Sequence, residues 1–594
     1  MGDDKLFWDL DKILPVDQFD SFYQQTKKKL DEFAKAAETL SPKMSVKDFK
    51  AFLDLDDSLS RNLSRLGNMP ELMGTTDQSS EKARVMQGQA MNLAAKTEQV
   101  STKVKLWLQG KLPDKEVLDD KNAKRLFAAD PNEEYSLNYL RDAGRHSLSL
   151  DGENALTMKE ASVGGSEWCK LRSLITSKFR YNFKPSGVNE VKVINTQDEL
   201  LSYVHSSKPE EREAAYTALF ELYKENLDEL SMIYRAVVKD WVLTSQLKNF
   251  KSPIARRNFA NKIPDKAIET LMEVCTENVG IYHDFFKWKA KALGMDKLRR
   301  FDIYAPLNAD DESMSFPDAM ALVLDTYDKF HPGFGKKARE ILNAGNIDSH
   351  PSKVKVSGAF CCTVTPDLLP YVLLNFSGKE RGVSTIAHEL GHGIHSLYAR
   401  NLSCNTQHAP LPLAETASTF GEMLLFERLL DKADDKTKVS MLSKKMADSF
   451  ATVIRQNYFV KFEIAAHEAI MKGTTPEDLS DIYFKQLEEQ FGNSVSLDSM
   501  FRYEWSYIPH MVNTPFYCYA YSFGDLLSLA LYSKYKSEGK TFIPKLEKIL
   551  ASGSSRDPQE VLKEVGVDMT SKDFWQGSFN LIKEWQNQLN KYSK

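Results

Sequence analysis

Residues 384–398 read STIAHELGHGIHSLY, and this stretch decides both the fold and the chemistry that we predict. His388 and His392 are four residues apart. On an α-helix such residues project from one face, about 40° apart, so both imidazoles can reach one ion. Glu389 is turned by about 100° from His388, which brings its carboxylate beside that ion, where it can accept a proton from water. The spacing therefore predicts a zinc site with a general base.

A catalytic zinc ion needs a third protein ligand and one open coordination position. A third histidine six residues after the second is excluded, because Tyr398 stands there. The segment 411–430 (LPLAETASTFGEMLLFERLL) is a following helix that offers Glu415 and Glu422 on one face. We assign Glu415 as the third ligand and Glu422 as the acceptor that orients a ligand imidazole.

Residues 388–392 form the motif HExxH, and we make structural predictions for three further residues of this helix. Ser384 can cap its start. Gly391 lowers helix stability by roughly 1 kcal/mol relative to alanine, which indicates that another backbone approaches closely there. His395 lies one turn beyond His392 on nearly the same face, and we interpret it as structural rather than as a ligand.

Length and composition limit the class of protein. A chain of 594 residues is too long for one compact core, so we expect two or more lobes. It is 42% hydrophobic and 27% charged, which is typical of a folded globular protein. The formal net charge of −5 is small and no long basic run is present, so we expect no nucleic-acid partner. No feature of the sequence sets the oligomeric state.

The start of the chain, MGDDKLFWDL, has acids where a secretory signal needs basic and apolar residues. No stretch approaches the roughly 18 uncharged apolar residues of a membrane span, so we expect no membrane partner. The six cysteines are scattered without a CxxC pair, which favours reduced thiols. Together these features predict a cytoplasmic protein.

Most of the sequence has the apolar periodicity of α-helices, as in 17–40, 208–247, 264–293, 437–472 and 476–491. Proline in the first turn marks two helix starts, in SKPE (207–210) and TPED (475–478). Strand signals are confined to 354–364 and 371–376 (YVLLNF), just upstream of the metal motif. We predict a mainly α protein with a small β-sheet beside the HExxH helix. The helical pattern breaks at 185–200, so we expect an N-terminal helical lobe, 1–195, and a catalytic domain, 196–594.

Peptide-bond hydrolysis also needs hydrogen-bond donors for the oxyanion of the tetrahedral intermediate. If Pro515 opens a helix, Tyr517 and Tyr521 are neighbours on one of its faces. Aromatic residues at helical spacing also pack in hydrophobic cores. The residues alone therefore do not decide whether these tyrosines contact the oxyanion or belong to the core. The stretch 510–524 offers these candidates: His510, Tyr517, Tyr519, which would face the opposite way, and Tyr521.

These motifs resemble those of the M3 family of zinc oligopeptidases, in particular its oligoendopeptidase F branch. The family pattern HE[LF]GHxxH matches 388–395, and its Glu–Ser segment with a second Glu seven residues on is similar to 415–422. Gly382 departs from the family, where an acid is frequent, but it lies outside the chemistry. The resemblance covers 200–594 closely and the N-terminal lobe loosely. Other similar segments are 302–306 (DIYAP), 357–361 (SGAFC), 373–378 (LLNFSG) and 551–568.

The resemblance implies an elongated, two-lobed, mostly helical body with one zinc ion per chain on the floor of a deep substrate channel. It also implies that His510 and Tyr517 contact the substrate and the oxyanion, with Tyr521 in the same cluster. An extended peptide could pair with an exposed strand edge at Leu374 and Asn375, irrespective of its side chains. An interior strand is the alternative there, because 372–374 is apolar throughout.

We therefore expect a zinc endopeptidase that cleaves internal bonds of short oligopeptides, with Glu389 as general base. An exopeptidase on the same zinc site is one alternative, but no charged pocket for a peptide terminus can be identified. A catalytically silent peptide-binding scaffold is another. It is disfavoured because both histidines, Glu389 and a plausible third ligand are present together.

Overall fold

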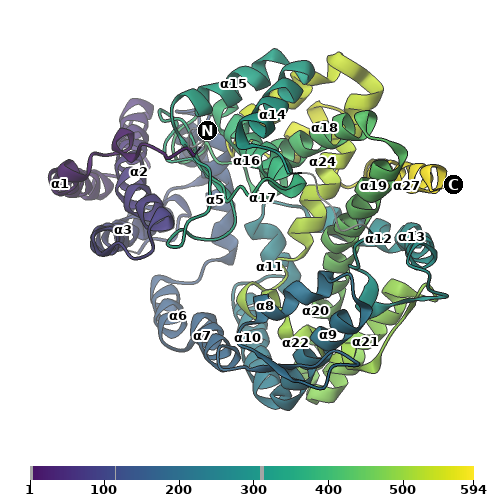
Figure 1. The fold of residues 1–594 in the computed structure, drawn as a ribbon. Coiled ribbons are helices and arrows are strands. Elements are labelled where there is room, and N and C mark those ends of the chain that lie inside the picture. The colour runs from purple at the N-terminus through teal and green to yellow at the C-terminus, as the bar shows by residue number, and fades with distance from the viewer. Residues whose placement is uncertain (1–4, 114, 308–312, 594) are drawn as a thin grey trace. The chain divides into compact units, whose positions relative to one another are not determined.

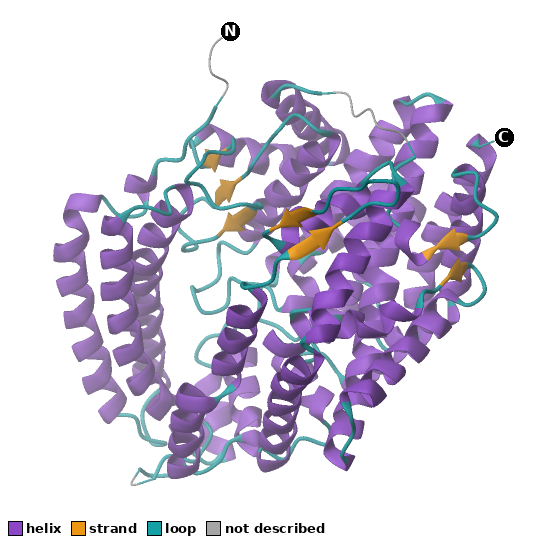
Figure 2. Ribbon diagram, turned by 60° about the horizontal axis from the view of Figure 1, so that its bottom comes forward, coloured by secondary structure: helices purple, strands orange, loops and turns teal. Residues whose placement is uncertain are grey.

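The computed structural model describes residues 5–113, 115–307 and 313–593. Helices dominate, and strands are few and short (Figure 2), which confirms the mainly α prediction. The chain forms two compact units that alternate along the sequence. Unit 1 comprises 1–150, 311–431 and 531–568, and unit 2 comprises the remainder. Neither unit begins near residue 196, so the predicted lobe boundary is not a boundary between these compact units, and the start of the catalytic domain stays a prediction.

Unit 1 holds the N-terminal helices and the HExxH helix, α16. Figure 1 labels most of these elements. Its helices and strands are α1 (Phe19–Glu38), α2 (Val46–Thr76), α3 (Glu81–Leu108), α4 (Asp120–Phe127), α5 (Glu134–Asp142), α14 (Phe316–Phe330), α15 (Pro332–Asn343), α16 (Glu380–Tyr398), α17 (Leu411–Ala414), α18 (Thr416–Lys432), α25 (Ile543–Ala551), α26 (Pro558–Glu564), β4 (Ile347–Asp348), β5 (Phe360–Cys362) and β6 (Tyr371–Leu373).

Unit 2 is also mostly helical, and α24 (Tyr519–Glu538) continues from it into residues of unit 1. Its other elements are α6 (Leu150–Val163), α7 (Gly165–Thr176), β1 (Tyr181–Phe183), β2 (Lys192–Ile194), α8 (Gln197–Ser202), α9 (Pro209–Glu225), α10 (Leu227–Leu247), α11 (Pro253–Ala260), α12 (Asp265–Glu277), α13 (Val279–Ala292), β3 (Leu298–Arg299), α19 (Asp435–Ser449), α20 (Arg455–Lys472), α21 (Pro476–Phe491), β7 (Val495–Ser496), α22 (Glu504–Tyr507), α23 (His510–Asn513) and α27 (Lys572–Tyr592).

Local sequence explains where several helices start. α21 begins with a capping box, in which Thr475 and Asp478 each bond the other's backbone N–H, and with Pro476 in its first turn. α9 likewise starts at Pro209, as predicted. The start of α16 was predicted wrongly. It lies at Glu380, so Ser384 is inside the helix and caps nothing.

The small sheet of unit 1 has the strand order β4-β6-β5. β6 is the central strand, parallel to β4 and antiparallel to β5, with Tyr371 opposite Cys362 and Leu373 opposite Phe360. Because β6 is paired on both sides and covered on both faces, its three residues are all apolar and buried. β5 and β6 pack against α16. The predicted sheet beside the HExxH helix is therefore confirmed.

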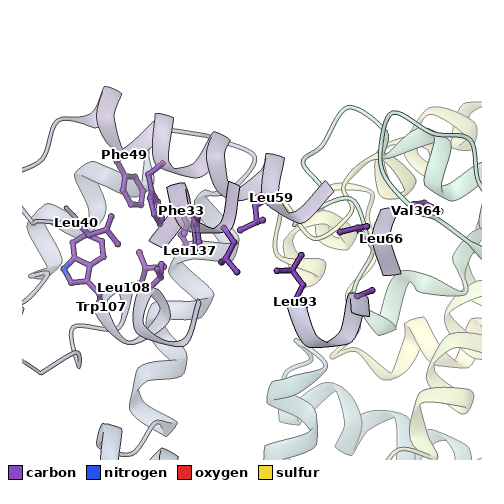
Figure 3. Packing of buried hydrophobic residues seen from close by; sticks show 14 of the residues in the cluster. Phe33, Leu40, Phe49, Leu59, Leu66, Leu93, Trp107, Leu108, Leu137 and Val364 are labelled. Atoms are coloured by element: carbon purple, nitrogen blue, oxygen red, sulfur yellow. The ribbon is translucent and has the colours of Figure 1, made fainter. Parts of the chain in front are cut away.

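A hydrophobic core joins the N-terminal helices to this sheet (Figure 3). Phe49 lies among aromatic rings of α2, α3 and α4, and the same cluster reaches Val364, just after β5, and Tyr371 of β6. Asp367, in the β5–β6 connection, forms ion pairs with Arg61 and Arg65 of α2. The N-terminal helices thus hold the sheet against which α16 packs.

Candidate metal centre

Three side chains bring possible metal-binding atoms together in unit 1. His388 and His392 project from one face of α16, with their Nε2 atoms 3.1 Å apart. Glu415 Oε2 lies 3.5 Å from Nε2 of His388 and 3.4 Å from Nε2 of His392. Two imidazole nitrogens and one carboxylate oxygen therefore form a nearly equilateral triangle, as the helix geometry and the predicted third ligand require.

The size of this triangle fits a metal ion. A tetrahedral ion bound at about 2.0–2.1 Å separates its ligand atoms by about 3.3–3.4 Å, close to the 3.1, 3.4 and 3.5 Å found here. Three carboxylates, those of Glu389, Glu415 and Glu422, surround the two imidazoles and favour a cation. The residues present thus fit a small divalent metal ion with nitrogen and oxygen ligands.

A glycine allows α16 and α18 to approach closely enough to complete the triangle. A Cβ built at Gly391 would lie 2.6 Å from Ser418 Cα and 2.7 Å from the carbonyl oxygen of Ala417. The close backbone approach predicted at Gly391 is therefore confirmed. Glu415 stands between α17 and α18 with φ −87° and ψ 3°, and its Oε2 accepts a hydrogen bond from Ser418 Oγ at 2.7 Å. A short junction, rather than the helix interior, positions this carboxylate.

Glu422 fixes the ring of His388. Its Oε1 lies 2.5 Å from Nδ1 of His388, so that ring presents Nε2 to the triangle. Burial alone would lower the pKa of His388, but the hydrogen bond and charge of Glu422, with Glu415 and Glu389, raise it to about 9. Burial lowers the pKa of His392. The carboxylates therefore stabilise a positive charge on the His388 ring. A bound metal ion would take the place of the proton that carries this charge.

Glu389 is 6% exposed and lies on the same helix, next to the ligand candidate His388. Burial, supported by the charges of Glu415 and Glu422 and opposed by His388, raises the pKa of Glu389 to about 7. A carboxylate with a pKa near neutrality is suited to accept and return a proton.

A cavity of about 370 Å³ opens beside these residues. His395 is buried in its wall but does not belong to the donor triangle. Sequence reasoning missed Gln407 and His408. The available signal was that these two polar residues lie just before Pro410 and α17, close in sequence to the proposed ligand Glu415. The lining residues are Ala359, Phe360, Cys361, Thr363, His388, Glu389, His392, His395, Ser396, Gln407, His408, Ala409 and Ala414.

The strand edge beside this cavity is β5, and the prediction of an exposed edge at Leu374 and Asn375 was wrong. Leu374 is 2% exposed, and its N–H donates to the carbonyl of Asp348 at 2.8 Å. The Asn375 side chain donates to the carbonyls of Val356 and Gly358. The parallel neighbour β4 makes β6 an interior strand. β5 is at the edge of the sheet, and Phe360 and Cys361 line the cavity.

The aromatic cluster around His510 belongs to unit 2. His510 Nε2 lies 3.1 Å from the hydroxyl of Tyr521, and the rings of His510 and Tyr517 are parallel at 6.3 Å. Tyr519 is buried and its hydroxyl accepts from Asn261 at 2.7 Å, whereas Tyr521 is exposed. The helix start predicted at Pro515 was wrong, because α24 begins only at Tyr519. Tyr517 nevertheless contacts Tyr521 edge to face at 5.3 Å.

An HExxH helix with a carboxylate donor supplied by the next helical segment is typical of metal-dependent peptidases. Residues 202–581 match peptidase family M3, and the chain belongs to this family. The chain is 28% identical over 451 residues to the oligopeptidase PepF of Bacillus subtilis. That match covers 74% of this chain and 66% of the relative, just under two thirds of its length.

Two solved structures show the same fold. A candidate peptidase from Chlamydophila abortus is 23% identical with a TM-score of 0.86, and the match covers 98% of both chains. The oligoendopeptidase F of Enterococcus faecium is 21% identical with a TM-score of 0.70, and the match covers 97% of this chain and 99% of that one. Among the described residues, no helix combines the length and apolar character that crossing a bilayer requires.

Proposed function

We propose that this protein is a zinc-dependent endopeptidase that hydrolyses internal bonds of short oligopeptides. The observation that carries this proposal is the donor triangle of His388, His392 and Glu415, with the buried carboxylate of Glu389 beside it. Membership of peptidase family M3 supports the reaction class. The spacing of the triangle is compatible with zinc, and the family supports that choice of metal, with one ion per chain.

Each residue then has a chemical task. Zinc bound at the triangle supplies a Lewis acid and lowers the pKa of a water molecule toward about 7. Glu389 accepts the proton of the attacking water and returns it to the leaving amine. Glu422 keeps Nε2 of His388 directed at the triangle. By the resemblance to the family, His510 and Tyr517 contact the substrate and the oxyanion, and Tyr521 belongs to the same cluster.

The substrate segment would pair with β5. An extended peptide can add a strand to a sheet edge through main-chain hydrogen bonds, and Phe360 and Cys361 of that edge line the cavity beside Glu389. Recognition through the main chain makes the enzyme tolerant of many side chains. It also requires an extended substrate, which favours oligopeptides over folded proteins. The predicted cytoplasmic location suits degradation of such peptides and stays a prediction.

Cleavage mapping tests the function. The zinc-loaded protein is incubated with a mixed peptide library and with an internally quenched peptide, and products are identified by mass spectrometry. Cleavage at internal bonds is expected, with activity lost after chelation and restored by zinc. Glu389→Gln is the matched control, because it leaves the ligand triangle intact while removing the base. Release of single terminal residues would indicate an exopeptidase, and stoichiometric zinc without cleavage would indicate a silent scaffold.

A further inference from the structure

A strained peptide precedes Tyr517 in unit 2. Phe516 has φ +59°, in the left-handed region, which costs a residue with a Cβ roughly 1–2 kcal/mol. Its side chain is 1% exposed, and its ring lies 4.5 Å from that of His467. Such a conformation persists only where the surroundings hold it.

Two polar side chains, those of Arg257 and Glu463, hold the peptide group that joins Pro515 to Phe516. Arg257 Nε, from α11, donates to the Pro515 carbonyl at 3.0 Å. Glu463 Oε1, from α20, accepts from the Phe516 N–H at 2.8 Å. Both polar atoms of one peptide plane are thus bonded to groups from two helices 206 residues apart in the sequence (463 minus 257). This arrangement fixes the plane's orientation and, with it, the direction in which the chain enters Tyr517.

We propose that Arg257 and Glu463 are positioning residues for peptide hydrolysis, and that they act by fixing the Pro515–Phe516 peptide so that Tyr517 is correctly oriented. This inference rests on the proposed function, in which Tyr517 contacts the oxyanion. Glu463 is buried and Arg257 is half-buried, and together they bond both polar groups of the peptide that leads directly into Tyr517. An apolar pair would leave this carbonyl and this N–H without partners and the orientation of the peptide unspecified.

The buried state of Glu463 indicates which substitution should be tolerated. Glu463 is 1% exposed, and burial raises its pKa to about 8, opposed by the Phe516 N–H and by Arg257. Its side chain is therefore largely neutral at pH 7. Glutamine has the same shape and keeps a carbonyl oxygen for the Phe516 N–H, whereas leucine fills the space without an acceptor.

Steady-state kinetics on the zinc-loaded full chain test the inference. Glu463→Leu and Arg257→Met are expected to lower kcat by about tenfold to a hundredfold, as misplacement of a reacting group does, with zinc content and KM little changed. Glu463→Gln is expected to stay close to wild type. Arg256→Met is the matched control, because Arg256 stacks on the same Trp241 ring as Arg257, at 4.0 Å against 5.2 Å, yet is not bonded to this peptide.

Two further measurements separate positioning from general damage. In a Tyr517→Phe background, Glu463→Leu should cause no additional loss of kcat, and hydrogen exchange at the Phe516 amide should be faster in Glu463→Leu than in Glu463→Gln. The inference is overturned if the folded Glu463→Leu variant keeps the wild-type kcat. It is also overturned if Glu463→Leu lowers kcat by the same factor in the wild-type and the Tyr517→Phe backgrounds. A wild-type chain that cleaves no peptide would instead overturn the proposed function, while the exchange rates would still show whether Glu463 holds the peptide.

Discussion

Glu422 holds His388 through a contact of 2.5 Å between Oε1 and Nδ1, on the side of the imidazole away from the donor triangle. Glu415 contacts the opposite nitrogen, Nε2, at 3.5 Å. One ring is thus placed between two carboxylates seven residues apart. The two acids have different tasks because only Glu415 also reaches His392.

Replacement of these two acids should separate their roles. Glu415→Ala should lose zinc at modest chelator concentration, because the variant lacks one of the three proposed protein ligands. Glu422→Ala should weaken zinc affinity by roughly 10- to 100-fold, since the His388 ring loses its orienting partner. Glu427→Ala, on the same helix but near Lys536, is the control. The zinc content of each variant after dialysis distinguishes the two roles. A Glu422→Ala variant that has lost its zinc, beside a Glu415→Ala variant that has kept it, would mean that Glu422 is the ligand.

Gly391→Ala should damage the site without touching a ligand. The added methyl would meet backbone atoms of Ala417 and Ser418 at 2.6–2.8 Å, and backbone cannot move aside as a flexible side chain can. Overpacking of this kind typically costs about 1–3 kcal/mol. The shift of α18 should also displace Glu415, so both Tm and zinc affinity should fall.

The control for this glycine is Gly67→Ala in α2, where a Cβ would meet nothing within 4 Å. Alanine should be neutral or stabilising there, by up to about 1 kcal/mol, because it favours the helix. Thermal unfolding and zinc titration of both variants provide the comparison. Equal behaviour of the two variants would mean that the close approach at Gly391 is not needed.

The sequence predicted the parts of the site that depend on local geometry. His388, Glu389 and His392 are placed by one helix, so spacing alone sets their faces. Gly391 indicated that another backbone segment lies close by, and in the structure that segment is the start of α18. Glu415 lies where the proposed ligand should, although its place at a helix junction depends on how α17 and α18 pack.

The errors concern features set by distant residues. Whether β6 has a free edge depends on β4, a two-residue strand that lies more than twenty residues upstream and pairs with it in parallel. The uninterrupted apolar run of β6 was nevertheless a signal of an interior strand. The left-handed backbone of Phe516 had no local signal, because it is held by Arg257 and Glu463 rather than by a glycine.

Glu463 should make stability depend on pH. Its pKa is raised from 4.5 to about 8 in the folded chain. Between these values the folded state binds more protons than the unfolded state, so the free energy of unfolding falls as pH rises, by at most about 1.4 kcal/mol per unit. Glu463→Gln removes this titration. Urea unfolding from pH 5 to 8 should show the free energy of unfolding of the variant rising relative to that of wild type as pH rises. A difference that stays constant with pH would contradict the raised pKa of Glu463.

Pairing of the substrate with the β5 edge should depend on alternate N–H groups of the peptide. Pairing with a strand edge uses the main-chain groups of every second residue of the added strand, because successive residues face opposite ways. N-methylation of single amides along a peptide substrate, away from the scissile bond, should therefore lower kcat/KM with a two-residue period. Each sensitive position should lose up to about tenfold, the value of one net hydrogen bond. Peptides methylated at the intervening positions are the internal control, since those N–H groups point away from β5. Uniform tolerance of methylation would show that side chains, not this strand edge, hold the substrate beside Glu389.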